Sequence, residues 1–280
     1  MQPAREHLSE RHYRSIVELI EGRVGIQLPA AKRTMVEGRL RRRLRALSLD
    51  GLGAYGRYVF DEGNLEAEFV HLVDCVTTNK TDFFREPAHF EFLRDQIRAW
   101  AAGRDRGRPV GLKLWSAAAS TGAEAYTVAM VIDDLVRQGV PLTYAILATD
   151  ISTEVLATAR AGIYPVEMLD QIPPSFRRRY VMEARNPARP VGRIAPELRR
   201  RVNVLRLNLM DESYPVDRDV DVVFCRNVLI YFDKPTQRQV IGRLADHLRP
   251  GGILIVGHSE SMAGAGVGGL RQLSPTVFGK

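Results

Sequence analysis

Cysteine is scarce in this sequence, and long apolar runs are absent. Only Cys75 and Cys225 occur among 280 residues. The chain therefore has neither a disulfide framework nor a CxxC metal pair, and a cytoplasmic location is expected. No apolar run approaches the roughly 18 residues needed to cross a bilayer, and the polar, charged start does not fit a signal peptide. These absences exclude a disulfide scaffold and predict no membrane insertion.

Lysine is also rare, because 35 of the 40 basic residues are arginine. The net charge of +7 raises the question of a nucleic-acid partner. Two segments carry this charge: residues 30–49 sum to +6 and residues 175–206 to +8, whereas the rest of the chain sums to −7. Such a distribution favours two local contact patches over uniform attraction to a polyanion.

Several motifs of cofactor and metal chemistry are missing. The sequence has no GxGxxG and no GxxxxGK[ST], which counts against a dinucleotide or a P-loop nucleotide. Its six histidines and two cysteines show no metal-ligand spacing, so no metal is expected. The segment GHSES resembles an esterase elbow, but Ser261 replaces the final glycine. A serine hydrolase is therefore not predicted.

Residues 1–76 are predicted to form a helical domain. In one helix the apolar side chains recur every three or four positions, at Val36, Leu40, Leu44 and Leu47. Arginines lie opposite or beside this stripe, at Arg39, Arg41, Arg42, Arg43 and Arg45. A Gly-rich turn is expected at 50–56, followed by a further helix that leads into TTNKTDFFRE.

Residues 77–280 alternate between short apolar runs and amphipathic segments. Strands are expected within 110–120, 144–151, 202–209, 221–229 and 252–260. Helices are expected over 124–138, 152–162, with Ser152 as the N-cap, and 234–252. This alternation predicts an α/β fold with a doubly wound, mostly parallel Rossmann-like sheet, and a ligand at the strand carboxyl ends. A small inserted subdomain is expected at about 170–205.

The first strand–turn–helix carries the candidate cofactor site. Small residues from Ala117 to Gly122 let a ligand approach the backbone closely. Asp150 ends the second strand, where an acid typically binds a ribose. A nucleoside without a pyrophosphate, most commonly S-adenosylmethionine, fits this pattern. Taken alone, Glu124 is equally a partner for its helix dipole, and Asp150 equally a loop or N-cap residue.

Several segments together resemble one known family. They are TTNKTDFFRE, WSAAASTGAEAYTVAM, ILATDI, RLNLM, FCRNVLIYFDKPTQ and LRPGGILIVGHSES. In this order and spacing they resemble the chemotaxis-receptor methyltransferases (CheR). The resemblance implies a class I methyltransferase domain at 77–280 behind a small all-α domain at 1–76. It also implies transfer of methyl groups from S-adenosylmethionine to glutamate side chains of chemoreceptor cytoplasmic helices.

The resemblance also implies roles for particular residues. The expected cofactor-binding residues are Asn79, Thr81, Arg85, Glu124, Asp150, Asn208, Leu209, Asn227 and Val228. Within this set Glu124 is assigned to the methionine amino group, Asp150 to the ribose, and Asn208 with Leu209 to the adenine. Where the family usually has GEEPYS this chain has GAEAYT, with Ala123 in place of the first acid. The amino-group contact therefore falls to Glu124 alone.

The expected catalytic residues are Arg85 and Tyr231, the second facing the methyl donor. A substrate glutamate has a pKa near ~4.3 and is already ionised at neutral pH, so no general base is needed. Arg85 can orient this carboxylate through a charge-assisted hydrogen bond. From the sequence alone, a structural salt bridge for Arg85 and a half-buried aromatic role for Tyr231 remain alternatives.

The first basic segment is the expected docking surface for glutamate-rich receptor helices. Its proposed docking residues are Arg39, Arg42, Arg43 and Arg45, although a solvated helix face fits the same pattern. In related enzymes the inserted subdomain can bind a pentapeptide at a receptor C-terminus, and the sequence leaves this open. Two alternative functions remain, a nucleic-acid methyltransferase and a non-catalytic cofactor-binding regulator. A nucleic-acid methyltransferase that acts on amino groups usually has an NPPY-like loop, and the corresponding segment CRNVLIY has no proline. The protein is expected to be a monomer and to bind no nucleic acid.

Overall fold

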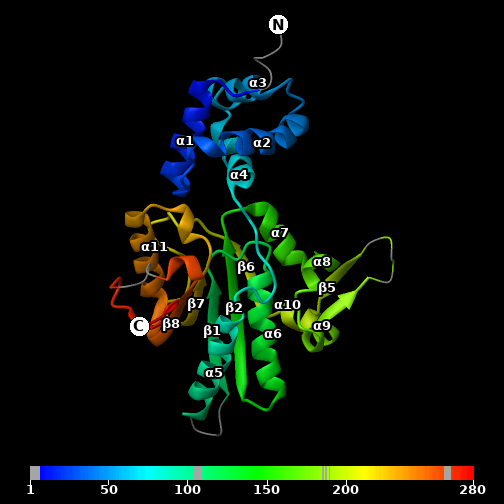
Figure 1. Cartoon of the computed structure of the whole chain (residues 1–280), viewed down its shortest axis with the longest axis vertical. Coiled ribbons are helices and arrows are strands. Elements are labelled where there is room, and N and C mark those ends of the chain that lie inside the picture. The colour runs from blue at the N-terminus through cyan, green and yellow to red at the C-terminus, as the bar shows by residue number, and fades with distance from the viewer. Residues whose placement is uncertain (1–6, 104–108, 185, 187, 189, 262–265) are drawn as a thin grey trace.

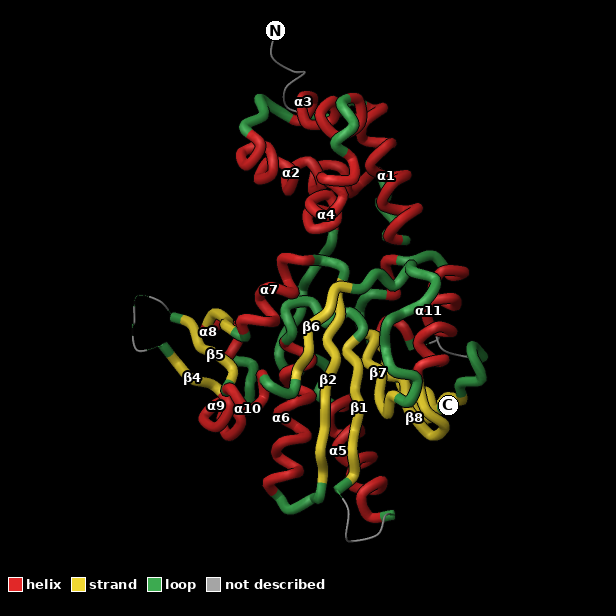
Figure 2. The backbone as a smooth tube through the Cα atoms, turned by 180° about the vertical axis from the view of Figure 1, so that it is seen from behind, coloured by secondary structure: helices red, strands yellow, loops and turns green. Residues whose placement is uncertain are grey.

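A seven-stranded sheet forms the centre of the molecule (Figures 1 and 2). The computed structural model describes residues 7–103, 109–184, 186, 188, 190–261 and 266–280. The strand order is β6-β2-β1-β7-β8-β10-β9. The first five strands in this order run parallel, whereas β10 is antiparallel to both of its neighbours. The chain winds outward from β1 in both directions, so the doubly wound sheet predicted from the sequence is confirmed.

The elements alternate along the chain after residue 88. The strands are β1 Val110–Ser116, β2 Leu142–Asp150, β3 Ile163–Pro165, β4 Val181–Glu183, β5 Val191–Ile194, β6 Val202–Arg206, β7 Val220–Cys225, β8 Leu248–Val256, β9 Arg271–Ser274 and β10 Val277–Gly279. The helices are α1 Glu10–Val24, α2 Arg33–Leu47, α3 Leu52–Gly56, α4 Leu65–Val76, α5 Ala88–Ala102, α6 Ala123–Arg137, α7 Thr153–Ala161, α8 Val166–Leu169, α9 Pro174–Tyr180, α10 Pro196–Arg199 and α11 Lys234–His247. Short 3-10 or π turns are η2 Ala30–Lys32, η3 Arg57–Asp61, η4 Leu229–Tyr231 and η5 His258–Glu260.

Alternate residues of the central strands pack into two separate cores. Leu114 and Phe224 face the core formed with α5 and α6. Trp115 and Cys225 face the opposite core, which includes α11 and the N-terminal helices. This alternation follows from the two-residue repeat of a strand. The Cys225 thiol is fully buried, and burial raises its pKa well above the ordinary value, so it is an unreactive core residue.

The N-terminal helices lie beyond the carboxyl ends of the parallel strands (Figure 1). Asp74 at the end of α4 accepts hydrogen bonds from the backbone N–H (2.9 Å) and the hydroxyl (2.8 Å) of Thr153 at the start of α7. Asn208 donates to the carbonyl oxygen of Arg23 near the end of α1, at 2.7 Å. These contacts hold the helical part over the edge of the sheet where a ligand is expected.

The start of α7 corrects one sequence-based expectation. Ser152 occupies the N-cap position, but its side chain makes no capping hydrogen bond. Asp74 supplies a capping interaction from a different helix, since its carboxylate receives the Thr153 N–H. A cap can therefore come from a residue distant in sequence, which local pattern does not reveal.

A separate three-stranded sheet, in the order β3-β5-β4, projects beside α6 (Figure 1). Its strands pair antiparallel. The sheet starts at Ile163, ahead of the range of about 170–205 expected for the insert. Among the described residues of this subdomain, Arg177 is paired with Asp170 and Glu183, so part of its basic charge is compensated locally.

Other element boundaries differ from the expectations. Residues 50–56 contain the helix α3 rather than only a turn, and α5 was not predicted. The helix expected over 234–252 ends at His247, and the strand expected at 252–260 begins at Leu248 and ends at Val256. Apolar residues at Val240, Ile241, Leu244 and Leu248 continue a helical spacing into the strand, which explains the overextension. Across the described part of the chain, no helix combines the length and apolarity that crossing a bilayer requires.

Candidate active site

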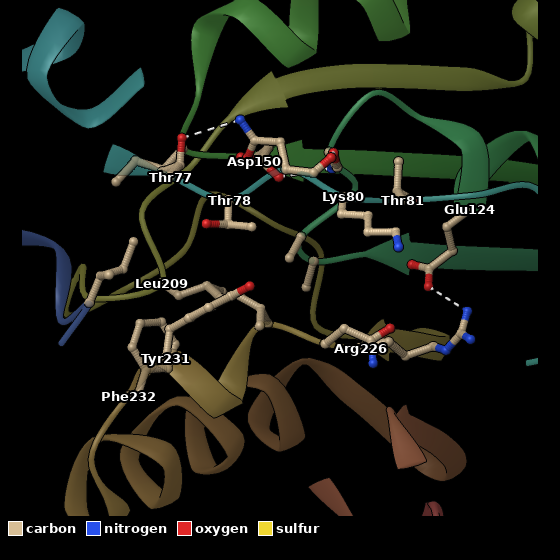
Figure 3. A pocket seen from close by; sticks show the side chains of 18 of the residues that line it. Thr77, Thr78, Lys80, Thr81, Glu124, Asp150, Leu209, Arg226, Tyr231 and Phe232 are labelled. Atoms are coloured by element: carbon tan, nitrogen blue, oxygen red, sulfur yellow. Dashed lines mark hydrogen bonds and ion pairs between the residues drawn. The ribbon is translucent and has the colours of Figure 1, made fainter. Parts of the chain in front are cut away.

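A cavity lies at the carboxyl ends of β1, β2 and β7 (Figure 3), and its empty space, together with the open solvent at its mouth, amounts to about 880 Å³. All predicted cofactor-binding and catalytic residues line it: Asn79, Thr81, Arg85, Glu124, Asp150, Asn208, Leu209, Asn227, Val228 and Tyr231. Val24 and Ile26 close one side from the end of α1. The structure thus brings residues from six separate sequence segments to one cavity.

The floor of the cavity is made of small side chains. Ala117 and Ala118 line it directly after β1. Gly122 then turns the chain into α6 with a φ of +88°, a left-handed conformation that favours glycine. A Cβ atom on Gly122 would lie 2.9 Å from the Cβ atom of Ala159. The turn therefore needs glycine, and its small neighbours leave room for a ligand against the backbone.

Asp150 is held rigidly at the end of β2. Its Oδ2 accepts the backbone N–H of Ser120 at 2.8 Å, and its Oδ1 accepts the backbone N–H of Ser152 at 3.0 Å. Burial raises the pKa of the Asp150 carboxyl, while these backbone donors act in the opposite direction. Two backbone donors thus orient the carboxylate and leave lone pairs for the two hydroxyls of a ribose. Ser120 also donates to the carbonyl oxygen of Asn79 at 2.8 Å, which joins the two loops.

Glu124 is buried and paired at the head of α6. Its Oε1 accepts the hydroxyl of Ser116 at 2.7 Å, and its Oε2 lies 2.9 Å from Nη1 of Arg226. Figure 3 shows this ion pair at one end of the cavity. Each carboxylate oxygen keeps a second lone pair, so the carboxylate can still accept a ligand ammonium group. The sequence did not single out Arg226, although it stands inside the CRNVLIYF motif.

Arg226 joins three parts of the site. Besides pairing with Glu124, its Nη2 donates to the backbone carbonyl of Arg85 at 2.5 Å and lies 3.1 Å from Oε2 of Glu86. The side chain of Arg226 is only 3 % exposed. A buried guanidinium shared by two carboxylates and a carbonyl fixes the relative positions of all three. Arg226 is therefore a positioning residue for both Glu124 and Arg85.

The two expected catalytic residues both line the cavity. Arg85 is half-buried, and its guanidinium donates to the carbonyl oxygen of Lys80 at 3.2 Å. Among the ion pairs of the described residues none involves Arg85, so the structural salt bridge considered above is not formed. Tyr231 follows β7 in the turn η4, and Lys32 lies 5.3 Å from the centroid of its ring. Figure 3 shows Tyr231 reaching into the cavity.

Two predicted cofactor residues already use their side-chain amides within the protein. Asn208 donates to Arg23 as described, and its Oδ1 accepts the backbone N–H of Met210 at 3.1 Å. Asn79 donates to the hydroxyl of Thr77 at 3.2 Å. Both residues line the cavity, but these bonds give them a structural role in shaping it.

The loop after β7 is held by Glu260 from the GHSES segment. The Glu260 carboxylate accepts the backbone N–H groups of Asn227 (2.8 Å), Gly257 (2.8 Å) and Ile230 (3.3 Å). Asn227 has a φ of +60°, which is strained for a residue with a side chain. The segment that looked like an esterase elbow therefore holds the loop after β7 in place. Glu260 was missed because two of its three partners, Asn227 and Ile230, lie about thirty residues earlier.

The four expected docking arginines divide into two kinds, and none of them lines the cavity. Arg39 donates to three carbonyls at the end of α4, including that of Thr77 at 2.7 Å. Arg43 makes a bidentate pair with Glu68, which is 2 % exposed. Arg42 is exposed and pairs with Glu154 of α7, and Arg45 is exposed. Arg39 and Arg43 therefore stabilise the helical domain itself.

A second groove lies on this surface and shares one lining residue with the cavity. Its basic lining residues are Arg39, Arg41, Arg42 and Arg45, and it also contains Asp74, Cys75, Thr77 and Glu154. Thr77 lines both this groove, called here the arginine groove, and the cofactor cavity.

The protein has a doubly wound sheet with a small-residue turn after β1 and an oriented acid after β2, and its sequence has no phosphate-binding loop motif. This combination is typical of a class I S-adenosylmethionine-dependent methyltransferase. Two family models match the chain: "CheR methyltransferase, all-alpha domain" over residues 11–77 and "CheR methyltransferase, SAM binding domain" over residues 79–273. The chain therefore belongs to the CheR methyltransferase family, as its motifs predicted.

Curated relatives agree with this assignment. A "Chemotaxis protein methyltransferase" of Salmonella typhimurium is 41 % identical, over 91 % of this chain and 85 % of the relative. "Chemotaxis protein methyltransferase 2" of Pseudomonas aeruginosa is 38 % identical over 97 % and 94 % of the two chains. A "Chemotaxis protein methyltransferase" of Borreliella burgdorferi is 32 % identical over 95 % and 92 %. Similarity thus extends over both the helical and the sheet-containing parts.

Proposed function

We propose that this protein transfers methyl groups from S-adenosylmethionine to glutamate side chains of chemoreceptor cytoplasmic helices, forming methyl esters for chemotactic adaptation. The carrying observation is the convergence of all ten motif residues on one cavity. No histidine or cysteine occurs among the described residues that line this cavity. A carboxylate substrate does not need one, because it is ionised at neutral pH.

The residues of the cavity fit the methyl donor by shape and by charge. Bound S-adenosylmethionine supplies an electrophilic methyl group on a positively charged sulfur. Asp150 is oriented to bind the ribose hydroxyls, and Glu124 presents a carboxylate to the methionine ammonium group. Ala117 and Ala118 leave space beside the backbone. Asn79, Thr81, Asn208, Leu209, Asn227 and Val228 form the remaining walls.

Arg85 and Tyr231 are proposed to align the substrate carboxylate. The reaction joins an anionic carboxylate to a cationic sulfonium, so charge disappears toward the transition state. Alignment, rather than proton transfer, is what the protein contributes. One arginine and one neutral hydroxyl orient the carboxylate, whereas tighter binding would reduce its nucleophilicity. The carbonyl contact between Arg85 and Arg226 fixes the backbone from which Arg85 reaches inward.

Receptor docking is proposed for the arginine groove, with Arg42 and Arg45 among its exposed cationic groups. The planar guanidinium group suits carboxylate recognition, and a glutamate-rich helix would lead from the groove past Thr77 to the cavity. Arg39 and Arg43 contribute by holding α2 against α4. Carboxylates of Asp74 and Glu154 also line the groove, which makes it less suitable for a continuous polyanion such as nucleic acid.

We further propose that the protein acts as a monomer in the cytoplasm. Cys75 and Cys225 are both free and buried, which fits a reducing compartment. Light scattering during size-exclusion chromatography tests the monomer. A nucleic-acid substrate would instead be indicated by tight, strongly salt-dependent binding to DNA or RNA.

The test of function is incubation with methyl-labelled S-adenosylmethionine and a receptor cytoplasmic fragment. We expect the fragment to take up label that mild base releases as methanol. A fragment in which every glutamate at the labelled sites is replaced by alanine is the matched control and remains unlabelled. Label that withstands base, or no transfer to any receptor fragment, would overturn the proposed function.

A further inference from the structure

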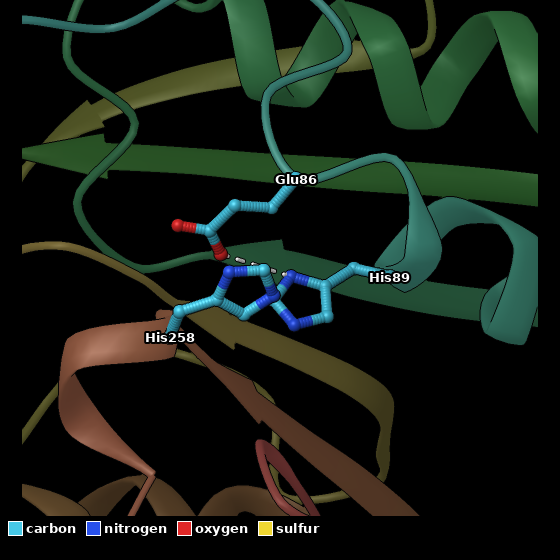
Figure 4. A group of neighbouring side chains, drawn as sticks. All are labelled: Glu86, His89 and His258. Atoms are coloured by element: carbon cyan, nitrogen blue, oxygen red, sulfur yellow. Dashed lines mark ion pairs between the residues drawn. The ribbon is translucent and has the colours of Figure 1, made fainter.

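Three ionisable side chains gather behind the active-site loop, outside the residues that line the cofactor cavity. They are Glu86, His89 and His258 (Figure 4). Their nearest ligand-type atoms all lie within 4.8 Å of one another, and the described residues contain no other such group. Glu86 and His89 flank the start of α5, whereas His258 follows β8. The sequence separation of His258 explains why no metal-ligand spacing was visible.

Two polar atoms in this group are buried without a hydrogen-bond partner. They are Nδ1 of His89 and Oε2 of Glu86, of which the latter also forms an ion pair with Nη2 of Arg226 at 3.1 Å. The other ring nitrogen of His89 lies 2.8 Å from the hydroxyl of Thr276. His89 is 3 % exposed. If Nε2–H donates to Thr276, Nδ1 carries a lone pair directed at Glu86, which is the arrangement by which a second-shell group orients a metal-binding histidine.

Glu86 is held in place for such a role. It has a φ of +59°, a strained backbone conformation that its surroundings must impose. Its Oε1 accepts a hydrogen bond from Asn227 at 3.2 Å, while Oε2 lies 3.1 Å from Arg226.

We propose that Glu86, His89 and His258 bind a divalent transition-metal ion of the Zn²⁺ class. Nδ1 of His89 and Oε2 of Glu86 are 3.4 Å apart. Ligands about 2.0–2.1 Å from a tetrahedral zinc ion are separated by about 3.3 Å, which matches this distance. Two imidazoles and one carboxylate form a ligand set that zinc commonly takes. His258 is exposed, so the ion can enter from solvent and keep a water in its fourth position.

Arg226 is positively charged and pairs with Glu86, so its charge opposes the binding of a cation there. Its guanidinium is shared between Glu86 and Glu124, so these three groups together carry one net negative charge. A divalent cation at Glu86 therefore meets a compensated, weakly negative environment. Because Glu86 also pairs with Arg226, an ion bound at Glu86 would lie next to the residue that positions Arg85 and Glu124. The site is distinct from methyl transfer, and its test does not depend on the proposed function.

The direct test is titration of the tag-free, EDTA-treated protein with Zn²⁺ by calorimetry. We expect one ion per chain with micromolar or tighter affinity. His258→Ala removes an exposed ligand and should weaken this binding by more than about 100-fold, while Thr276→Val removes the orienting hydroxyl and should weaken it about 10–100-fold. His71→Ala, which changes a histidine of α4 outside the group, is the matched control and should bind like the wild type.

A spectroscopic readout separates this site from adventitious binding. Co²⁺ bound by two imidazoles and a carboxylate in four-coordinate geometry should give intense visible absorption bands, and His258→Ala should lose them. Cofactor affinity measured on the same variant checks that it is folded. Equal Zn²⁺ affinity in the wild type and His258→Ala, or no stoichiometric binding to the folded wild type, would overturn the proposal.

Discussion

The cofactor cavity and the arginine groove meet at Thr77, yet they are built in opposite ways. In the cavity, Glu124 and Arg226 are buried and bonded to several groups each. In the groove, Arg42 and Arg45 are exposed, and the pair between Arg42 and Glu154 lies on the surface. Buried charge pairs depend strongly on every partner, whereas exposed pairs contribute little individually and weaken with salt.

This difference separates two tasks within one protein. The cofactor always has the same structure, and the residues of its cavity are held rigidly by bonds to one another. A partner helix that must bind and leave is matched by exposed charges on the rim, which affect encounter more than the chemical step. Substitutions in the cavity should therefore alter stability, cofactor binding or the rate of transfer. Substitutions of the exposed groove residues Arg42 and Arg45 should alter only recognition of the receptor.

The largest effect is expected for Arg226→Met, because it leaves Glu86 and Glu124 as unpaired buried carboxylates. Removing one partner of a buried pair costs about 3–5 kcal/mol of the free energy of unfolding. Denaturant unfolding measures this loss, with exposed Arg178→Met as the control. Adding Glu124→Gln to Arg226→Met should recover part of the stability. A loss below about 1 kcal/mol would show that the cavity is not interlocked through Arg226.

Arg85→Ala is expected to have the next largest effect. Misplacing the substrate carboxylate should lower the single-turnover rate of transfer about 100-fold. The free energy of unfolding should stay close to that of the wild type, since the structure shows no ion pair at this side chain. Cofactor affinity is measured separately by calorimetry. An unchanged transfer rate would remove Arg85 from the catalytic residues.

Asp150→Asn tests the ribose site. A hydrogen bond to a charged group contributes about 1.5–3 kcal/mol, so the Kd for S-adenosylmethionine should rise at least about 10-fold. The new amide would also place an N–H group against the backbone donor of Ser120 or Ser152. Asp95→Asn, at an exposed position of α5, is the control and should not change the Kd. Equal Kd values in both variants would contradict the assignment of Asp150.

Arg45→Glu should have the smallest effect. An exposed charge contributes about 1 kcal/mol or less, so the KM for a receptor fragment should rise about three- to fivefold at low salt, with kcat and cofactor affinity unchanged. High salt should reduce the difference from the wild type. Arg178→Glu in the inserted subdomain makes the same charge change elsewhere. Equal effects of the two variants would show that only net charge matters and would contradict docking in the groove.

Much of the cavity could be predicted from the sequence because its residues belong to short motifs at strand ends. The carboxyl ends of parallel strands meet at one edge of a sheet, so Asp150, Glu124 and Asn227 had to lie near one another once the strands were recognised. Local pattern also predicted the small-residue turn before α6. The class of ligand followed from this turn and from the missing phosphate motifs.

The partners of charged side chains could not be predicted in the same way. Arg43 and Arg226 looked like surface or motif residues, but tertiary structure pairs each with a buried carboxylate distant in sequence. Glu260 was hidden for the same reason. In α3 the glycines indicated a turn, and packing of Leu52 and Tyr55 into the helical core overrode that preference.

The pH dependence of single-turnover methyl transfer tests the central claim, that the cavity aligns an already ionised carboxylate without a general base. With cofactor and receptor fragment saturating, the rate should be constant from about pH 6 to pH 9, because a glutamate with a pKa near ~4.3 is ionised throughout this range. A fall should appear only at lower pH, as the substrate becomes protonated. A rate that instead rises or falls through an inflection near neutral pH would reveal an essential acid or base in the protein and contradict the account.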